Sequence, residues 1–207
     1  MDRLKRADQG GAMKQSASGT TTTEIGRLFR YFARTMKYSS QNSRLQIAVI
    51  GAGEASTELY DLAFRTGEAL AQAGAVVVCG GRGGVMESVC AGAQSVGGRT
   101  LGILPGAGPE DSPPNLYVDT VVYTGMGQAR NLCVVLSGDA AIAIGGGWGT
   151  LSEIALARKH GVPVVLLSGW KPTTFPAEGE DPGLVQAEEP ADAVHQALEL
   201  GALRRNP

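Results

Sequence analysis

The sequence predicts an α/β protein built on a doubly wound parallel sheet of about six to seven strands, arranged in three layers. Apolar runs of Val, Ile, Leu and Ala recur along the chain, helical segments separate them, and each major run ends in glycine. Strands that are apolar on both faces are typical of a parallel sheet covered by helices on each side. The 30 glycines and 5% aromatic residues also fit tightly turned βα units better than a sandwich or a bundle. The predicted fold is therefore Rossmann-like.

The first part of the chain, residues 1–44, is predicted to be a polar extension that precedes a single domain at 45–207. Residues 1–24 are rich in Gly, Ser and Thr and poor in core-forming side chains, which predicts disorder. Within 25–37, apolar side chains at Ile25, Leu28, Phe29 and Phe32 share one face of a helical wheel, which predicts a short amphipathic helix. Such a helix either docks on its own domain or a neighbouring subunit, or serves a membrane surface or a partner. The sequence leaves both interpretations open.

The domain alternates strands and helices. The expected strands lie in 45–53, 75–84, 99–106, 118–125, 139–150 and 162–170, with a last short strand near Leu184. The expected helices are 56–73, 85–97 and 128–137, one that ends near His160, and 190–200. In a sheet of this kind ligands bind beyond the carboxyl ends of the strands. Because the glycine clusters stand at those ends, we expect a ligand site within 80–150.

Composition and charge argue against several kinds of site. A formal net charge of −2 gives no sign of the basic surface that polymeric nucleic acid requires. Cys79, Cys90 and Cys133 have no CxxC spacing, and only His160 and His195 are available as histidine ligands, so we expect reduced thiols and no metal site. No apolar run approaches the roughly 18 residues that span a bilayer, and the start of the chain does not resemble a signal peptide. We therefore expect a cytoplasmic protein that binds neither membranes nor nucleic acid.

The first glycine motif, Gly51-Ala52-Gly53, directly follows the opening strand. A dinucleotide fingerprint would continue to a third glycine, but Glu54 and Ala55 follow here, so an ordinary NAD site is not expected. Gly51 and Gly53 either contact a ligand or simply make a tight turn.

The second motif places four glycines around one arginine at the start of a helix. Its candidate ligand-binding residues are Gly80, Gly81, Arg82, Gly83, Gly84 and Glu87. The loop is predicted to present backbone N–H groups to an anion, with Arg82 adding a charge-assisted contact. In the alternative interpretation the glycines only supply turn geometry and Arg82 points to solvent.

The third motif joins a buried strand to a helix. Its candidate ligand-binding residues are Gly146, Gly147, Trp148, Gly149 and Thr150. Backbone N–H groups and the Thr150 hydroxyl are expected to hold phosphate oxygens at the positive end of the helix. Glu153 follows about one turn later and belongs either to the same site or to the helix start, where a carboxylate caps the helix or offsets its dipole.

The paired stretches GGRGGVME and GGGWGTLSE resemble the Lonely Guy family, long mislabelled as lysine decarboxylases, over roughly residues 45–200. In phosphoribohydrolase members of that family, the stretch that corresponds to GGGWGTLSE binds the phosphate of a nucleoside monophosphate. The resemblance implies that Glu153 and Arg130 are catalytic in such an enzyme. Two positions depart from the family pattern, because Gly145 replaces a proline and Asn131 replaces a lysine. These departures favour the branch of the family that carries the molybdenum cofactor.

Two functions follow from the residues and the resemblance together. The first is hydrolysis of the N-glycosidic bond of a nucleoside 5′-monophosphate, of the cytokinin-riboside-monophosphate type, which yields a free base and ribose 5-phosphate and requires no cofactor. The second is a non-catalytic carrier that binds molybdopterin, the molybdenum cofactor or a nucleotide in the same loops. A third interpretation treats the motifs as relics in a protein that acts through oligomer contacts. The resemblance also implies a homodimer or homotetramer.

A pyridoxal-dependent lysine decarboxylase is not expected. Such an enzyme needs a lysine that forms a Schiff base with the cofactor. Beyond the N-terminal extension only Lys159 and Lys171 are available, and neither is close to a glycine-rich anion loop in the sequence.

Overall fold

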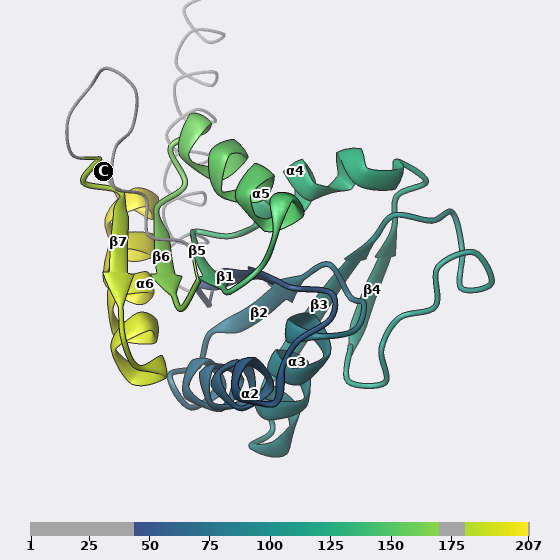
Figure 1. Ribbon diagram of the computed structural model, residues 1–207, viewed down its shortest axis with the longest axis horizontal. Coiled ribbons are helices and arrows are strands. Elements are labelled where there is room, and N and C mark those ends of the chain that lie inside the picture. Colours follow the sequence, from purple (N-terminus) through teal and green to yellow (C-terminus); the bar gives the residue numbers. More distant parts are fainter. Residues whose placement is uncertain (1–43, 170–180, 207) are drawn as a thin grey trace, which may run out of the picture. The chain divides into compact units, whose positions relative to one another are not determined.

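The computed structural model describes residues 44–169 and 181–206, all within the compact unit Arg44–Pro207. Seven parallel strands form one sheet in the order β4-β3-β2-β1-β5-β6-β7 (Figure 1). The strands are β1 (Gln46–Gly51), β2 (Val76–Cys79), β3 (Arg99–Leu104), β4 (Thr120–Tyr123), β5 (Ala140–Ile144), β6 (Val164–Leu167) and β7 (Leu184–Ala187). The predicted α/β fold with a doubly wound parallel sheet is confirmed. The predicted extension and the amphipathic helix at 25–37 lie outside the described residues.

Helices alternate with the strands along the chain. They are α2 (Thr57–Gln72), α3 (Val85–Ser95), α4 (Asn131–Ser137), α5 (Trp148–Lys159) and α6 (Pro190–Arg205), and a 3₁₀ turn, η1 (Gly127–Arg130), runs into α4. Several boundaries have local causes, since the Ser56 hydroxyl caps α2 and Pro190 stands at the first position of α6. No helix in the described ranges has both the length and the apolar content needed to cross a membrane.

The sheet separates two apolar layers. Side chains such as Ile47 and Val49 pack with those of α2, α3 and α6 on one face. The alternate side chains of the same strand, Ala48 and Ile50, pack with those of α4 and α5 on the other face. Because successive side chains of a strand point to opposite faces, β1 is buried on both sides. This explains why the strand runs in the sequence are continuously apolar, and it confirms the three-layer arrangement.

The order of the strands places the glycine loops together. Strand β1 lies between β2 and β5, and Gly51 at its end is in register with Ile144 at the end of β5. The chain winds outward from β1 in one direction through β2 to β4, and in the other direction from β5 to β7. This reversal at β1 and β5 is the topological switch point at which open α/β sheets form a ligand crevice.

Candidate functional site

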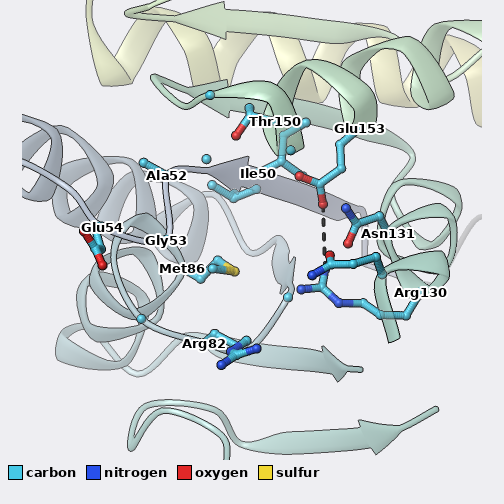
Figure 2. Close-up of a pocket in the computed structure, with 17 residues that line it drawn as sticks. Ile50, Ala52, Gly53, Glu54, Arg82, Met86, Arg130, Asn131, Thr150 and Glu153 are labelled. Carbon is cyan, nitrogen blue, oxygen red and sulfur yellow. Dashed lines mark ion pairs between the residues drawn. The ribbon is translucent and has the colours of Figure 1, made fainter. Parts of the chain in front are cut away.

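A cleft of about 500 Å³ opens at the switch point, beyond the carboxyl ends of β1, β2 and β5 (Figure 2). Ten of the predicted site residues line it: Gly51, Gly53, Gly80, Arg82, Gly83, Arg130, Gly147, Gly149, Thr150 and Glu153. The volume falls within the range of about 300–1,000 Å³ that is usual for small-molecule sites. The three glycine motifs, which are far apart in the sequence, therefore meet around one cavity.

Five other candidate residues do not line this cleft: Gly81, Gly84, Glu87, Gly146 and Trp148. The carboxylate of Glu87 accepts a hydrogen bond of 3.0 Å from the Tyr60 hydroxyl, which connects α3 to α2. Trp148 is 82% exposed at the start of α5. Gly81 and Gly84 have φ of +69° and +66°, so both shape the backbone of the second loop.

Arg130 and Glu153 face each other at the inner end of the cleft. Arg130 ends η1, and Glu153 is in the second turn of α5. Only 7% of Arg130 and 8% of Glu153 is exposed, and Arg130 Nη1 lies 3.7 Å from Glu153 Oε1 (Figure 2). This is an ion pair without a hydrogen bond, because 3.7 Å exceeds hydrogen-bonding distance. Among the described residues, Arg130 Nε is also buried without a hydrogen-bond partner. Both charged groups thus keep unused hydrogen-bonding capacity.

Burial shifts the protonation of this pair. It raises the pKa of Glu153 to about 7, although the nearby Arg130 charge acts in the opposite direction. Burial also lowers the pKa of Arg130, against the favourable effects of Glu153 and Cys79 and together with the repulsion from Arg82. The charged form of each group is disfavoured because the partner does not fully replace the water that burial removes. A buried carboxyl with a pKa near neutrality is typical of functional sites.

Gly80 provides the space that Arg130 occupies. A Cβ atom at Gly80 would lie 2.7 Å from both Nη1 and Nη2 of Arg130 and 2.8 Å from Met86 Sδ. Any larger residue at this position would meet the guanidinium group directly. Gly80 therefore accommodates the Arg130 guanidinium beside the cleft, and its lack of a side chain has a steric reason.

The start of α5 has the features of an anion site. Gly147 is the N-cap, and no side chain of the described residues caps the helix through a hydrogen bond. Gly147 and Gly149 line the cleft, and a Cβ at either would meet no atom within 4 Å. Thr150 is 3% exposed and lines the same wall. The interpretation of Glu153 as a capping residue is wrong, because α5 begins at Trp148 and Glu153 is its sixth residue.

Some backbone N–H groups of the second glycine loop and of the α3 start already donate hydrogen bonds within the protein. The Val85 N–H, at the start of α3, donates to the Ala52 carbonyl at 3.0 Å, and the Gly81 N–H donates to Cys79 Sγ at 3.3 Å. A Cβ at Gly84 would lie 2.5 Å from the Gly53 carbonyl oxygen, so the loops after β1 and β2 are in direct contact. The α3 start therefore has fewer free N–H groups than the motif alone suggests, and the α5 start is the stronger candidate for an anion site.

The cleft also contains residues that were not among the candidates: Val49, Ile50, Ala52, Glu54, Met86, Gln128 and Asn131. Asn131 matters most for the chemistry. It lies beside Arg130 and Glu153 in Figure 2, and its Oδ1 atom is buried without a hydrogen-bond partner among the described residues. The sequence indicates this residue only through its position, since Asn131 directly follows Arg130 and begins α4.

Metal ligation finds no support in the described part of the chain, where no group of three or more His, Cys, Asp or Glu residues could hold a metal ion. Cys79 and Cys90 are buried free thiols, and Cys133 is a half-buried one. The cleft offers a helix start for an anion, the buried Arg130 guanidinium, the buried Glu153 carboxyl and the Asn131 amide, with Glu54, Arg82 and Gln128 at exposed positions of its lining.

Fold and cleft together define the protein as a Rossmann-like α/β protein with glycine-rich loops around a switch-point cleft. The chain belongs to the SLOG cluster4 family, whose model matches residues 44–194. An uncharacterized protein from Archaeoglobus fulgidus is 44% identical over 140 residues, which cover 65% of this chain and 91% of that protein.

Two solved structures are similar over almost their whole length. The molybdenum cofactor binding protein from Rippkaea orientalis is 34% identical, with a TM-score of 0.67 over 77% of this chain and 98% of that one. The molybdenum cofactor carrier protein from Chlamydomonas reinhardtii is 32% identical, with a TM-score of 0.66 over 77% and 99%. The resemblance to a family close to the molybdenum cofactor carriers is thereby confirmed.

Proposed function

We propose that this protein is a carrier that binds a small phosphorylated ligand of the molybdopterin type, the molybdenum cofactor included, and releases it unchanged. The observation that carries this proposal is the similarity to two proteins named for binding or carrying that cofactor, at 32–34% identity over 98–99% of their chains. The matched region of this chain includes the whole cleft. The proposal therefore concerns the cleft and not the N-terminal residues.

The residues of the cleft fit a ligand with a terminal phosphate. The uncapped start of α5, with Gly147, Gly149 and Thr150, would hold the phosphate oxygens through backbone N–H groups and a hydroxyl. Arg130 would supply a charge-assisted hydrogen bond, since its guanidinium is at the cleft and makes no hydrogen bond within the described residues. A volume of about 500 Å³ leaves room for a fused ring beside the phosphate.

A second candidate, the phosphoribohydrolase, is favoured by one observation. Glu153 is a buried carboxyl with a pKa raised to about 7, next to Arg130 in the same cleft. In hydrolysis of an N-glycosidic bond, positive charge develops on the sugar, and an ionised Glu153 would stabilise it or orient the attacking water. Arg130 would then hold the phosphate or assist the leaving base.

One experiment separates the two candidates. The purified full chain is incubated with a panel of nucleoside 5′-monophosphates while free base is followed by chromatography, and binding of molybdopterin is measured in parallel. Glu153→Gln is the test variant, and Glu199→Gln is the matched control, because Glu199 is exposed on α6. A carrier binds molybdopterin and releases no base from any nucleotide. Base release by wild type and by the control, lost in Glu153→Gln, would replace the carrier with the hydrolase.

A further inference from the structure

Two negative groups compete for one buried cation in the cleft. Among the described lining residues the cations are Arg130, which is buried, and Arg82, which is exposed. Glu153 Oε1 already lies 3.7 Å from Arg130 Nη1, in a part of the cleft where each side chain is about nine-tenths buried. An anion that reaches the Arg130 guanidinium therefore comes close to the Glu153 carboxylate as well. Two unscreened negative charges around a single guanidinium repel each other strongly.

The other charged side chains of the cleft, Arg82 and Glu54, are both exposed and opposite in sign, so no second buried cation relieves this repulsion. Asn131 and Thr150, which also line the cleft, are neutral. Of the described charged groups, Arg130 is the one that acts on Glu153 directly, while Arg82 acts on Arg130. Removing the charge of Glu153 is then the simplest way to free the guanidinium for a ligand.

We propose that an anionic ligand enters this cleft together with one proton. The ligand replaces Glu153 as the ion-pair partner of Arg130, and the Glu153 carboxylate takes up the proton from solvent. This inference rests on the proposed function, because it describes how that cleft binds its anion. It adds a regulation by pH: affinity for the anion rises as the solution becomes more acidic. It also assigns Glu153 a role in binding that is independent of any hydrolysis.

The protonation equilibrium of the free protein supports this coupling. Burial raises the pKa of Glu153 to about 7, so a proton is available to this group near neutral pH. If only the protonated form accepts the anion, the apparent dissociation constant scales inversely with the protonated fraction. That fraction falls from roughly nine-tenths at pH 6 to roughly one-tenth at pH 8. Binding is therefore expected to weaken about tenfold between these pH values.

Sulfate is a suitable probe because it remains a dianion throughout this pH range, whereas a phosphate monoester itself titrates near pH 6. Titration calorimetry of the full chain at pH 6 and pH 8, in buffers of different ionisation enthalpy, gives the affinity and the number of protons taken up. Wild type should bind about tenfold more weakly at pH 8 and take up close to one proton per sulfate there. Glu199→Gln, with its exposed carboxylate, should behave like wild type.

Two variants test the assignment. Glu153→Gln should bind sulfate equally at both pH values, with no proton uptake and at least the affinity of wild type at pH 6. Asn131→Lys places a second cation beside Arg130, which should reduce the pH dependence well below tenfold. Sulfate binding by wild type without pH dependence or proton uptake would overturn this inference and leave the anion site intact. Failure to bind sulfate or any phosphate ligand at either pH would overturn the proposed function together with it.

Discussion

Replacing Gly80 with alanine should weaken anion binding strongly while leaving the fold almost unchanged. The new Cβ would lie 2.7 Å from both terminal nitrogens of Arg130 and 2.8 Å from Met86 Sδ. Both neighbours are the far ends of flexible side chains, and Gly80 does not have a positive φ, so the backbone tolerates alanine there. Shifting two side chains from their preferred rotamers costs about 1 kcal/mol, part of which the lower entropy of the unfolded chain offsets.

The effect on binding is expected to be much larger. If Arg130 can no longer reach the ligand, the loss of a charge-assisted hydrogen bond costs about 1.5–3 kcal/mol. At about 1.4 kcal/mol for each factor of ten, affinity should fall about 10- to 150-fold. Calorimetric titration with sulfate at pH 6 measures the affinity, and thermal unfolding measures the stability, with an expected shift of no more than about 4 °C.

Two glycine variants make this prediction specific. Gly108→Ala is the neutral control, since a Cβ there would meet no atom within 4 Å and Gly108 is outside the cleft. Gly84→Ala is the structural control, because φ is +66° and the Cβ would lie 2.5 Å from the Gly53 carbonyl oxygen. Gly84→Ala should lose at least about 2 kcal/mol of stability. If Gly80→Ala keeps wild-type affinity, or is destabilised as much as Gly84→Ala, the reasoning about Arg130 is refuted.

Three further predictions concern stability. The raised pKa of Glu153, about 7 against an unfolded value near 4.5, means that the folded protein binds more protons between these pH values. Stability should therefore decrease as pH rises through this window, by up to about 3 kcal/mol, in urea unfolding of wild type but not of Glu153→Gln. Gly92→Ala should destabilise by about 3 kcal/mol or more in the same assay, because its Cβ would overlap the Phe64 carbonyl group where α2 and α3 touch. Asp139→Asn should lose about 2 kcal/mol, because its carboxylate binds Arg205 of α6, and an unchanged unfolding midpoint would contradict that role.

The sequence was sufficient to predict the elements of the fold. Strands β1, β5 and β6 were visible as continuous runs of Val, Ile, Leu and Ala, and the structure explains this pattern because these strands are buried on both faces. The glycine loops could be assigned to one edge, since parallel strands with helical crossovers end on the same side of a sheet. Most of the predicted cleft residues follow from this one rule.

The order of the strands in the sheet could not be predicted from local sequence patterns. Which loops become neighbours depends on β1 lying between β2 and β5, and no single motif contains that information. For the same reason the sequence did not reveal that Gly80 makes room for Arg130, which follows about fifty residues later. Nor could the motif show that the Val85 N–H is already bonded to Ala52, because that contact joins two separate loops.

The two departures from the Lonely Guy pattern, Gly145 and Asn131, have different physical consequences. Gly145 has φ of +56°, which a proline ring cannot adopt, and its N–H donates to the Ser168 carbonyl at 3.2 Å, a bond that proline cannot make. The glycine is therefore required by the path of this loop, and it does not bear on whether Glu153 is catalytic. Asn131, by contrast, lines the cleft beside Arg130, where a lysine would bring a second positive charge to the ligand. The balance between carriage and hydrolysis should thus respond to a change at Asn131, while Gly145→Pro should only disrupt the loop.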